Sequence, residues 1–250
     1  MASQRKGEQA QSEERSKREQ RAERILDAAA ELMLRWGYNK TTIDDIARQA
    51  GVAKGTIYLH WKTREDLFTA LMKREYIRLA EDIRQRLSSD PEGGTLHGLT
   101  KHSVLATMKS PLMKAVLLRD TDLLGEWMRK EYASVSYSEQ IAQSLALFEH
   151  LRSRGVVRDD IDIHKQAYML SAISMGFLVI DQYMPDDFKY SDEEIVEMVT
   201  EVVERVFAPA PSSAPPPDEK TKQEISNTVI SSLDDILAIR NRIDQEEDTP

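Results

Sequence analysis

The sequence contains no cysteine among its 250 residues, which excludes a disulfide framework and thiolate chemistry. It also lacks a long hydrophobic run. The longest mostly apolar stretch without a charge, Ala167 to Ile180, has fourteen residues, fewer than the ~20 that a membrane-spanning helix needs. The N-terminus is charged and polar and has no apolar core of a signal peptide. We therefore expect a soluble cytoplasmic protein with no membrane partner, built as one large domain or two smaller ones.

Signatures of enzymes and metal sites are missing as well. The segment GVAKGT does not satisfy the phosphate-loop pattern, and neither GxSxG nor HExxH occurs. None of the histidines pairs with another ligand at a zinc-site spacing; they are His60, His97, His102, His150 and His164. We predict a protein that is not an enzyme and holds neither metal nor cofactor.

The charge of the chain is divided unevenly. The net charge is −9, but residues 1–64 contain 13 Lys+Arg against 9 Asp+Glu, whereas residues 65–250 contain 21 against 34. A basic excess at one end is what contact with a polyanion such as DNA requires. The acidic remainder is expected to repel DNA and to help orient the bound protein.

Residues 41–67 have the layout of a helix-turn-helix, TTIDDIARQAGVAKGTIYLHWKTREDL. Thr42 is placed to cap a first helix, and Gly51 follows its last turn, where a left-handed backbone costs little only for glycine. The second helix, about residues 54–60, is too short to be stable alone and must be held by packing. Ile57 and Trp61, four residues apart, are its predicted anchors. In such motifs the second helix enters the major groove of duplex DNA.

The rest of the chain is helical by pattern. Before the helix-turn-helix, one helical face carries Ile25, Ala29, Leu32, Met33 and Trp36. No later segment alternates apolar and polar residues long enough to predict a strand. Further helices are predicted at about residues 63–87, 95–108, 111–118, 121–132, 136–154, 162–184, 192–207 and 222–243. The fold class is therefore predicted to be all-α.

The order of the motifs TTIDDIA, GVAKGTIY, HW and KTREDLF resembles the N-terminal domain of the tetracycline-repressor (TetR) family of transcription regulators, over about Arg24 to Met72. The family more often has phenylalanine or tyrosine around Leu59 and Trp61. The resemblance implies a three-helix DNA-binding domain followed by a helical ligand-binding and dimerisation domain. It also implies that these residues contact DNA: Thr42, Arg48, Lys54, Gly55, Thr56, Tyr58, His60 and Lys62.

By the same resemblance, the middle helices are expected to enclose a pocket for a small apolar or amphipathic molecule. The predicted lining is large, adaptable or aromatic: His102, Met108, Met113, Leu117, Leu124, Trp127, Met128, Tyr132, Phe148 and Tyr168. His102, Tyr137 and Asp181 are candidates for polar contacts. The alternative for each residue is an ordinary place in the core.

The two last strong helices are unusually apolar, which predicts a homodimer through a four-helix bundle. The predicted interface residues are Ile173, Phe177, Ile180, Val199, Val202 and Val206, and the alternative is burial within one subunit. A dimer places two recognition helices ~34–36 Å apart and so recognises a near-palindromic site.

The predicted domains are residues 1–21, 22–68, 69–207, 208–221 and 222–250. They are a charged arm, the DNA-binding domain, the ligand-binding and dimerisation domain, a proline-rich linker, and an amphipathic helix with a tail. The arm lacks apolar side chains and is expected to be disordered without DNA. It is either a basic arm that reaches DNA through Arg15, Lys17, Arg18 and Arg21, or a solvated tail. The last helix can pack on the body, cross to a partner subunit or bind another protein, and its apolar stripe favours docking.

These inferences converge on a dimeric, ligand-responsive transcription regulator, a repressor that a small molecule releases from its operator. The alternative hypothesis is a helical ligand-binding or protein-interaction module with weak or lost DNA binding. Lys54, Thr56, Tyr58 and Lys62 count against that alternative, because a module that no longer binds DNA does not need them.

Overall fold

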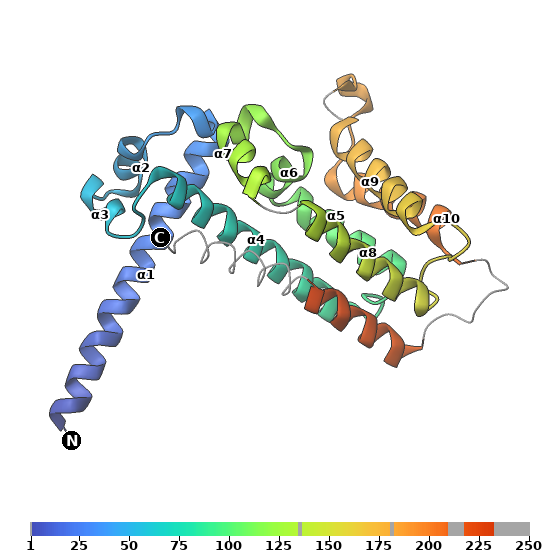
Figure 1. Cartoon of the computed structure of the whole chain (residues 1–250), viewed down its shortest axis with the longest axis horizontal. Coiled ribbons are helices and arrows are strands. Elements are labelled where there is room, and N and C mark those ends of the chain that lie inside the picture. The colour runs from blue at the N-terminus through green and yellow to red at the C-terminus, as the bar shows by residue number, and fades with distance from the viewer. Residues whose placement is uncertain (1, 135–136, 181–182, 210–217, 233–250) are drawn as a thin grey trace. The chain divides into compact units, whose positions relative to one another are not determined.

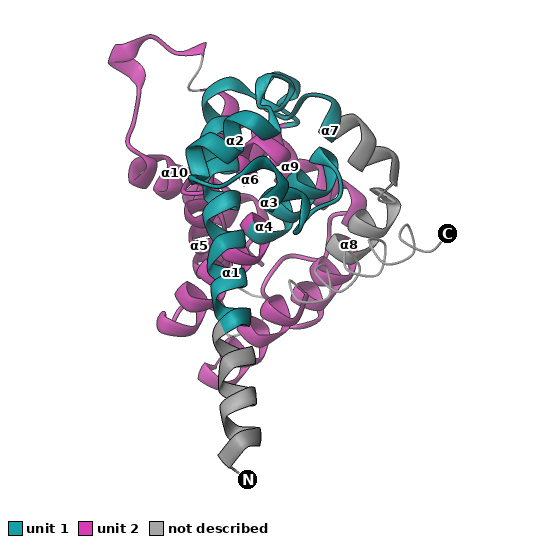
Figure 2. Ribbon diagram, turned by 90° about the vertical axis from the view of Figure 1, so that its left-hand side faces the viewer, with its two compact units in different colours: residues 1–74, 119–129 teal, residues 75–118, 130–250 magenta. Residues whose placement is uncertain are grey.

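The computed structural model describes the chain except residues 1, 135–136, 181–182, 210–217 and 233–250, and it gives no side-chain placement for residues 2–13 and 128–144. Every regular element in the described part is helical, so the predicted all-α class is confirmed (Figure 1). The chain divides into two compact units, which Figure 2 colours separately. Unit 1 comprises residues 1–74 and 119–129, and unit 2 comprises residues 75–118 and 130–250.

Unit 1 is built around the helix-turn-helix. Its elements are α1 (Ala2–Trp36), the short η1 (Tyr38–Lys40), α2 (Ile43–Ala50), α3 (Lys54–Tyr58), the start of α4 (Arg64–Ser89) and the start of α7 (Thr121–Ser134). The predicted apolar face of α1 is buried at Ile25, Ala29 and Met33, each 0% exposed. Trp36 is an exception to the prediction, because it is 40% exposed at the end of the helix, with the Arg35 guanidinium 5.7 Å from its ring.

The N-terminal arm differs from its prediction. Its composition predicts disorder, yet α1 is helical from Ala2 onward. The physical reason is that Ala, Arg, Lys, Glu and Gln, which are good helix formers, dominate the segment. The arm has few apolar side chains, but it can still be helical because it continues α1, whose later turns are packed in unit 1.

Unit 1 also contains a segment that the sequence pattern assigns to the second domain. The Trp127 side chain is buried and its Nε1 donates a hydrogen bond to Thr69 Oγ1 at 3.2 Å. Gly37, with φ 77°, lies so close to the start of α7 that a Cβ would be 2.9 Å from the Asp122 carbonyl oxygen. Leu124 is 0% exposed in the same segment. The start of α7 is therefore part of the core of the DNA-binding unit.

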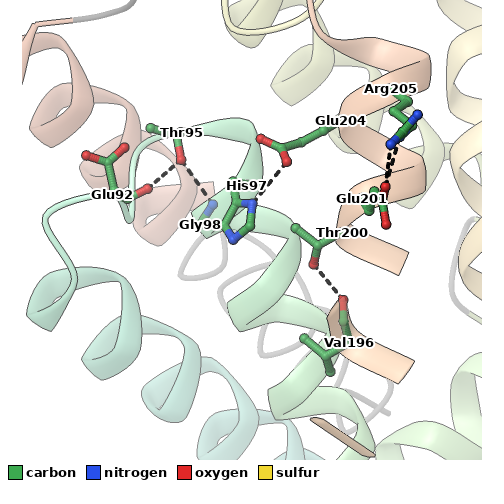
Figure 3. Close-up of polar contacts among 9 residues, drawn as sticks. All are labelled: Glu92, Thr95, His97, Gly98, Val196, Thr200, Glu201, Glu204 and Arg205. Carbon is green, nitrogen blue, oxygen red and sulfur yellow. Dashed lines mark hydrogen bonds and ion pairs between the residues drawn. The ribbon is translucent and has the colours of Figure 1, made fainter. Parts of the chain in front are cut away.

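Unit 2 contains the remaining helices around one apolar core. They are the rest of α4, α5 (Leu96–Met108), α6 (Pro111–Leu118), α8 (Tyr137–Ser153), α9 (Ile163–Ile180), η3 (Asp186–Phe188), α10 (Asp192–Phe207) and a helix over residues 219–232. Helix α10 packs on α5 and α9, and α9 also packs on α6 and α8. In Figure 3, His97 of α5 lies against Glu204 of α10, with 3.0 Å between Nδ1 and Oε2.

Side-chain caps begin two of the helices in unit 2. The Thr95 hydroxyl accepts the Gly98 amide at 3.1 Å to begin α5. Ser191 and Glu194 form a full capping box at the start of α10. Helix α9 ends at Ile180, short of the predicted Met184, and residues 181–182 lie outside the described part.

The helix over residues 219–232 docks on its own unit. Ile225 and Val229 are 0% and 8% exposed and belong to the core of unit 2. Polar contacts fix its start, since Lys222 Nζ lies 2.6 Å from the Glu92 carboxylate. Of the three possibilities left open by the sequence, the structure shows packing on the body. The predicted continuation to Ile243 lies outside the described residues.

Helix α9 is poorly covered. Among the described helices, it alone is long and apolar enough to cross a membrane, judged by length and composition. The fourteen-residue uncharged run, Ala167 to Ile180, is shorter than this helix and does not by itself indicate a span. A single such helix is weak support for a membrane span, and only 11% of it is buried in the chain. Its large exposed side chains include Tyr168, Met175 and Ile180.

Candidate DNA-binding surface

Helix α2 begins at Thr42 as the sequence predicts. The Thr42 hydroxyl accepts the Asp45 amide at 3.2 Å and lies 2.6 Å from the Asp45 carboxylate, to which it donates. That hydrogen bond lowers the pKa of Asp45, and the neighbouring Arg48 guanidinium, 3.2 Å away, acts in the same direction. Asp45 is therefore ionised at the positive N-terminus of α2, where a negative charge is favourable.

The turn between α2 and α3 depends on one glycine. Gly51 has φ 65° and ψ 39°, the left-handed conformation, and ends α2. The next residue, Val52, donates its amide to the Ala47 carbonyl at 3.0 Å, which satisfies an otherwise unpaired carbonyl at the helix end. The backbone then enters α3 at Lys54, and the direction of α3 follows from this turn.

Helix α3 buries one side chain and presents the others. Ile57 is 0% exposed and is the anchor that the sequence predicts. Trp61 is only half-buried, and the His60 ring lies 5.2 Å from it. Tyr58 and Leu59 are 46% and 74% exposed. The short helix is thus held from one side, and its opposite side is open.

No contact in the described part of the chain requires glycine at position 55. A Cβ on Gly55 would meet nothing within 4 Å, and its backbone is ordinary right-handed helix. A glycine inside a helix costs about 0.5–1 kcal/mol relative to alanine. A residue that weakens the helix without relieving a clash within the chain indicates that another molecule approaches the backbone there.

A cluster that the sequence does not predict fixes the start of α2 to α4. Tyr38 is 2% exposed and its ring packs edge-on against Phe68 at 4.8 Å. The Arg64 guanidinium lies 3.9 Å from the centre of the Tyr38 ring and donates to the backbone carbonyls of Tyr38 and Thr41. Burial is the main cause that raises the pKa of Tyr38. The sequence gives one sign of this cluster, the aromatic residue directly after Gly37. The local pattern around it indicates only a connection between two helices.

Positive side chains gather at the far end of α3. The pKa of His60 is lowered, first by burial and then by the positive charges of Arg18 and Arg21. Two residues of the N-terminal arm are therefore near enough to α3 to act on it electrostatically. Lys62 is exposed and makes no ion pair with any residue that the structure describes. Lys54, by contrast, lies 2.9 Å from the Asp44 carboxylate, and both side chains are exposed.

All eight predicted DNA contacts lie in unit 1. Six are exposed, and two, Thr56 and His60, are half-buried. The exposed six are Thr42, Arg48, Lys54, Gly55, Tyr58 and Lys62.

The predicted pocket residues are not brought together as one set. Leu124 and Trp127 are buried in unit 1, whereas the other described members belong to unit 2. In unit 2, His102, Met108 and Met113 are buried and Phe148 is half-buried. Leu117 and Tyr168 are 44% and 77% exposed and line no interior of the chain. The side chains of Met128, Tyr132 and Tyr137, and all of Asp181, lie outside the described residues.

His102 stands out among these residues. Its Nε2 lies 2.7 Å from Asp90 Oδ2, and its Nδ1 is buried without a partner among the described atoms. The pKa of Asp90 is lowered mainly by the Glu92 amide, which donates to it at 2.9 Å, and further by His102. An orphan ring nitrogen in an apolar core is costly unless another group satisfies it.

The predicted interface residues differ in exposure. Ile180 is 43% exposed, and Ile173, Phe177, Val202 and Val206 are half-buried. Val199 is 0% exposed because α10 turns it into the core of its own unit. Val199 therefore presents no surface to another chain.

Comparisons with known proteins agree with the helix-turn-helix. Residues 25–71 match the family described as "Bacterial regulatory proteins, tetR family". The "Fatty acid metabolism regulator protein" of Bacillus subtilis (strain 168) is 42% identical over 69 residues, so that the match spans 26% of this chain and only 36% of the length of that protein. The "HTH-type transcriptional repressor AcnR" of Corynebacterium diphtheriae is 24% identical over 158 residues, 63% of this chain and 79% of that protein.

Among solved structures, the transcriptional regulator FadR from Bacillus subtilis, in complex with stearoyl-CoA, shares the fold. It has a TM-score of 0.53 and 22% identity, and the match covers 72% of this chain and 96% of that one. Both of the named sequence relatives are regulators. The family match, residues 25–71, lies in unit 1 and includes α3.

Proposed function

We propose that the chain is a dimeric repressor of transcription in the cytoplasm, released from its operator by a small molecule, because residues 25–71 match the tetR family of bacterial regulatory proteins and solved regulators share the fold. The observation that carries the proposal is the open face of α3. This face presents Gly55 without any clash to relieve, together with the exposed side chains of Lys54, Tyr58 and Leu59. Insertion of α3 into the major groove gives each of these features a role.

Electrostatics support the same orientation. The positive charges of Arg18 and Arg21 act on His60 at the end of α3, and Lys62 lies two residues further along the chain. Phosphates on either side of a groove need positive groups flanking the recognition helix. We infer that Arg18 and Arg21 of the arm, together with Lys62, contact the phosphate backbone.

The dimer in this proposal uses α9 and α10. The residues that the structure describes leave the apolar face of α9 uncovered, with Met175 and Ile180 exposed and Ile173 and Phe177 half-buried. A second copy with the same face forms a four-helix bundle that removes these side chains from water. Val202 and Val206 of α10 flank this face, and Val199 takes no part.

The effector in this proposal is apolar or amphipathic and binds in unit 2. Met108 and Met113 are buried, adaptable apolar side chains of unit 2, and the buried Nδ1 of His102 is an orphan polar atom that a ligand could satisfy. A FadR of similar fold has been solved with stearoyl-CoA, so a long-chain acyl-CoA is the first probe. The effector must bind the arrangement that cannot hold DNA more tightly than the one that can, because otherwise it shifts no equilibrium.

A mobility-shift assay with DNA from upstream of the protein's own gene tests the proposal. We expect a complex at low salt that stearoyl-CoA or a related probe dissociates. A folded dimer that binds no DNA at low salt would favour the alternative, a helical ligand-binding or interaction module.

The variant Lys62→Ala refines the test. It should weaken binding to every sequence and lower the slope of log K against log salt by about 0.9 for each phosphate that the side chain neutralises. The matched control is Lys220→Ala, which removes an exposed lysine in unit 2 and should leave the slope unchanged. An unchanged slope in Lys62→Ala would show that Lys62 does not contact a phosphate.

A further inference from the structure

Leu59 occupies the outermost position of the recognition helix. It follows α3 directly and keeps helical backbone angles, φ −75° and ψ −17°. Its amide donates to the Gly55 carbonyl at 3.2 Å, the bond of a regular helical turn. At about 100° per residue, Gly55 and Leu59 each lie about 160° from the buried Ile57. The two residues therefore form a strip on the side of α3 that faces away from unit 1.

The fold of the chain does not require leucine at this position. Leu59 is 74% exposed, against 42% for Leu34 and 44% for Leu117, the other strongly exposed leucines in the described part. A leucine this exposed gains little from burial within the chain, so its apolar side chain is of most use against an apolar partner. Its neighbours Lys54, Tyr58 and His60 carry the polar groups that can reach phosphates and base edges.

The major groove offers one apolar group on a base edge, the C5-methyl of thymine. We propose that Leu59 is a specificity residue that recognises a thymine methyl group in each half of the operator. Gly55, one turn earlier on the same strip, lets the helix backbone come close enough for this contact. The inference rests on the proposed function, because it requires α3 to lie in the major groove.

In this arrangement two kinds of contact contribute to recognition of the operator. Polar side chains around the strip fix the position of α3 on the duplex and hydrogen-bond to bases, whereas Leu59 adds discrimination at one thymine. Burial of a single methyl group corresponds to about a fourfold change in affinity for each half-site. A dimer with two equivalent contacts changes by about fifteenfold when both methyl groups are removed.

The experiment begins with selection of bound sites from a randomised duplex library, using the full-length protein. Each thymine of the selected site is then replaced in turn by deoxyuridine, which removes only the methyl group. We expect one thymine per half-site at which this replacement weakens wild-type binding about fourfold. Leu59→Ala should abolish that dependence on the methyl group and retain the salt dependence, because its phosphate contacts are unchanged.

Two controls separate this contact from other effects. Leu34→Ala removes an exposed leucine on α1 and should keep the full dependence on the methyl group. Thermal unfolding of Leu59→Ala should match the wild type, since an exposed side chain contributes little to stability. If Leu59→Ala keeps the same dependence, or if no thymine shows it in the wild type, the role of Leu59 is refuted and the proposed function stands. If no sequence is selected at low salt, both fail together.

Discussion

His60 links the charge of the arm to the stability of unit 1. Its pKa is lowered by burial and by Arg18 and Arg21, so the folded protein takes up a proton at this ring less readily than the unfolded chain does. The stabilising contribution of the neutral ring is therefore complete above the ordinary pKa of 6.5. It is lost as the pH falls below that value toward the folded pKa.

This sign predicts a pH-dependent free energy of unfolding. Between about pH 7 and about pH 5, His60→Gln should lose less stability than the wild type, because it has no ring to protonate. Urea unfolding at both pH values measures the difference. His164→Gln, which changes an exposed histidine, should behave like the wild type. Equal losses in wild type and His60→Gln would show that the ring is not held neutral.

At the scale of single residues, local features can be predicted from the sequence and tertiary contacts cannot. The caps Thr42 and Ser191, the turn at Gly51 and the anchor Ile57 depend on local rules and are predictable. The cluster of Arg64 with Tyr38 is not, because an arginine above a buried ring is a tertiary contact that spacing does not encode.

At the scale of elements, the helix over residues 219–232 depends on a close approach at Gly94. A Cβ added there would overlap the backbone carbonyl of Lys222. The helix can therefore dock only on a residue without a side chain. Its apolar residues Ile225 and Val229 complete the core of unit 2.

Gly94→Ala should displace this helix and destabilise unit 2 by about 1–3 kcal/mol, as overpacking does. Limited proteolysis should then cut near residue 219 faster than in the wild type. The comparison variant is Gly55→Ala, whose Cβ meets nothing within 4 Å and which should unfold at the same temperature or slightly higher. If Gly94→Ala is cut at the same rate as the wild type, the helix can shift without a loss of stability.

Helix positions are largely predictable because caps, glycine stops and apolar periods are local. The bounds of α5, α6 and α10 match their predictions to within one residue. Membership of a unit is not predictable in this way. The start of α7 packs around Thr69 and Gly37, and neither contact leaves a periodic trace in the sequence.

At the scale of the whole molecule, the uncovered face of α9 predicts an assembly. Ile180→Glu puts a charge on this face and should yield a folded monomer in sedimentation experiments, since Ile180 is 43% exposed in the chain. Operator affinity should fall on the order of 10²–10⁴-fold, because the second recognition helix is no longer tethered. Leu34→Glu makes the same change on α1 and should remain dimeric. A dimeric Ile180→Glu would place the interface elsewhere.

The resemblance to the tetR family follows from about 50 residues of motif, and the family match over residues 25–71 agrees with it. The all-α class follows from the helical pattern, and the solved structures share the fold. The residues of a ligand pocket cannot be predicted from the sequence in the same way. Residues chosen for their type lie in two units, because composition says that a side chain is adaptable but not which core it fills.

The docking of residues 219–232 also sets an order of events during synthesis. Unit 1 has all of its segments once residue 129 has left the ribosome, and Trp127 can then close onto Thr69. Unit 2 cannot close its core until Ile225 and Val229 emerge about a hundred residues later. The nascent chain therefore carries a complete DNA-binding unit while the apolar core of unit 2 still lacks its last helix, and during that interval its exposed apolar surface is most prone to aggregation.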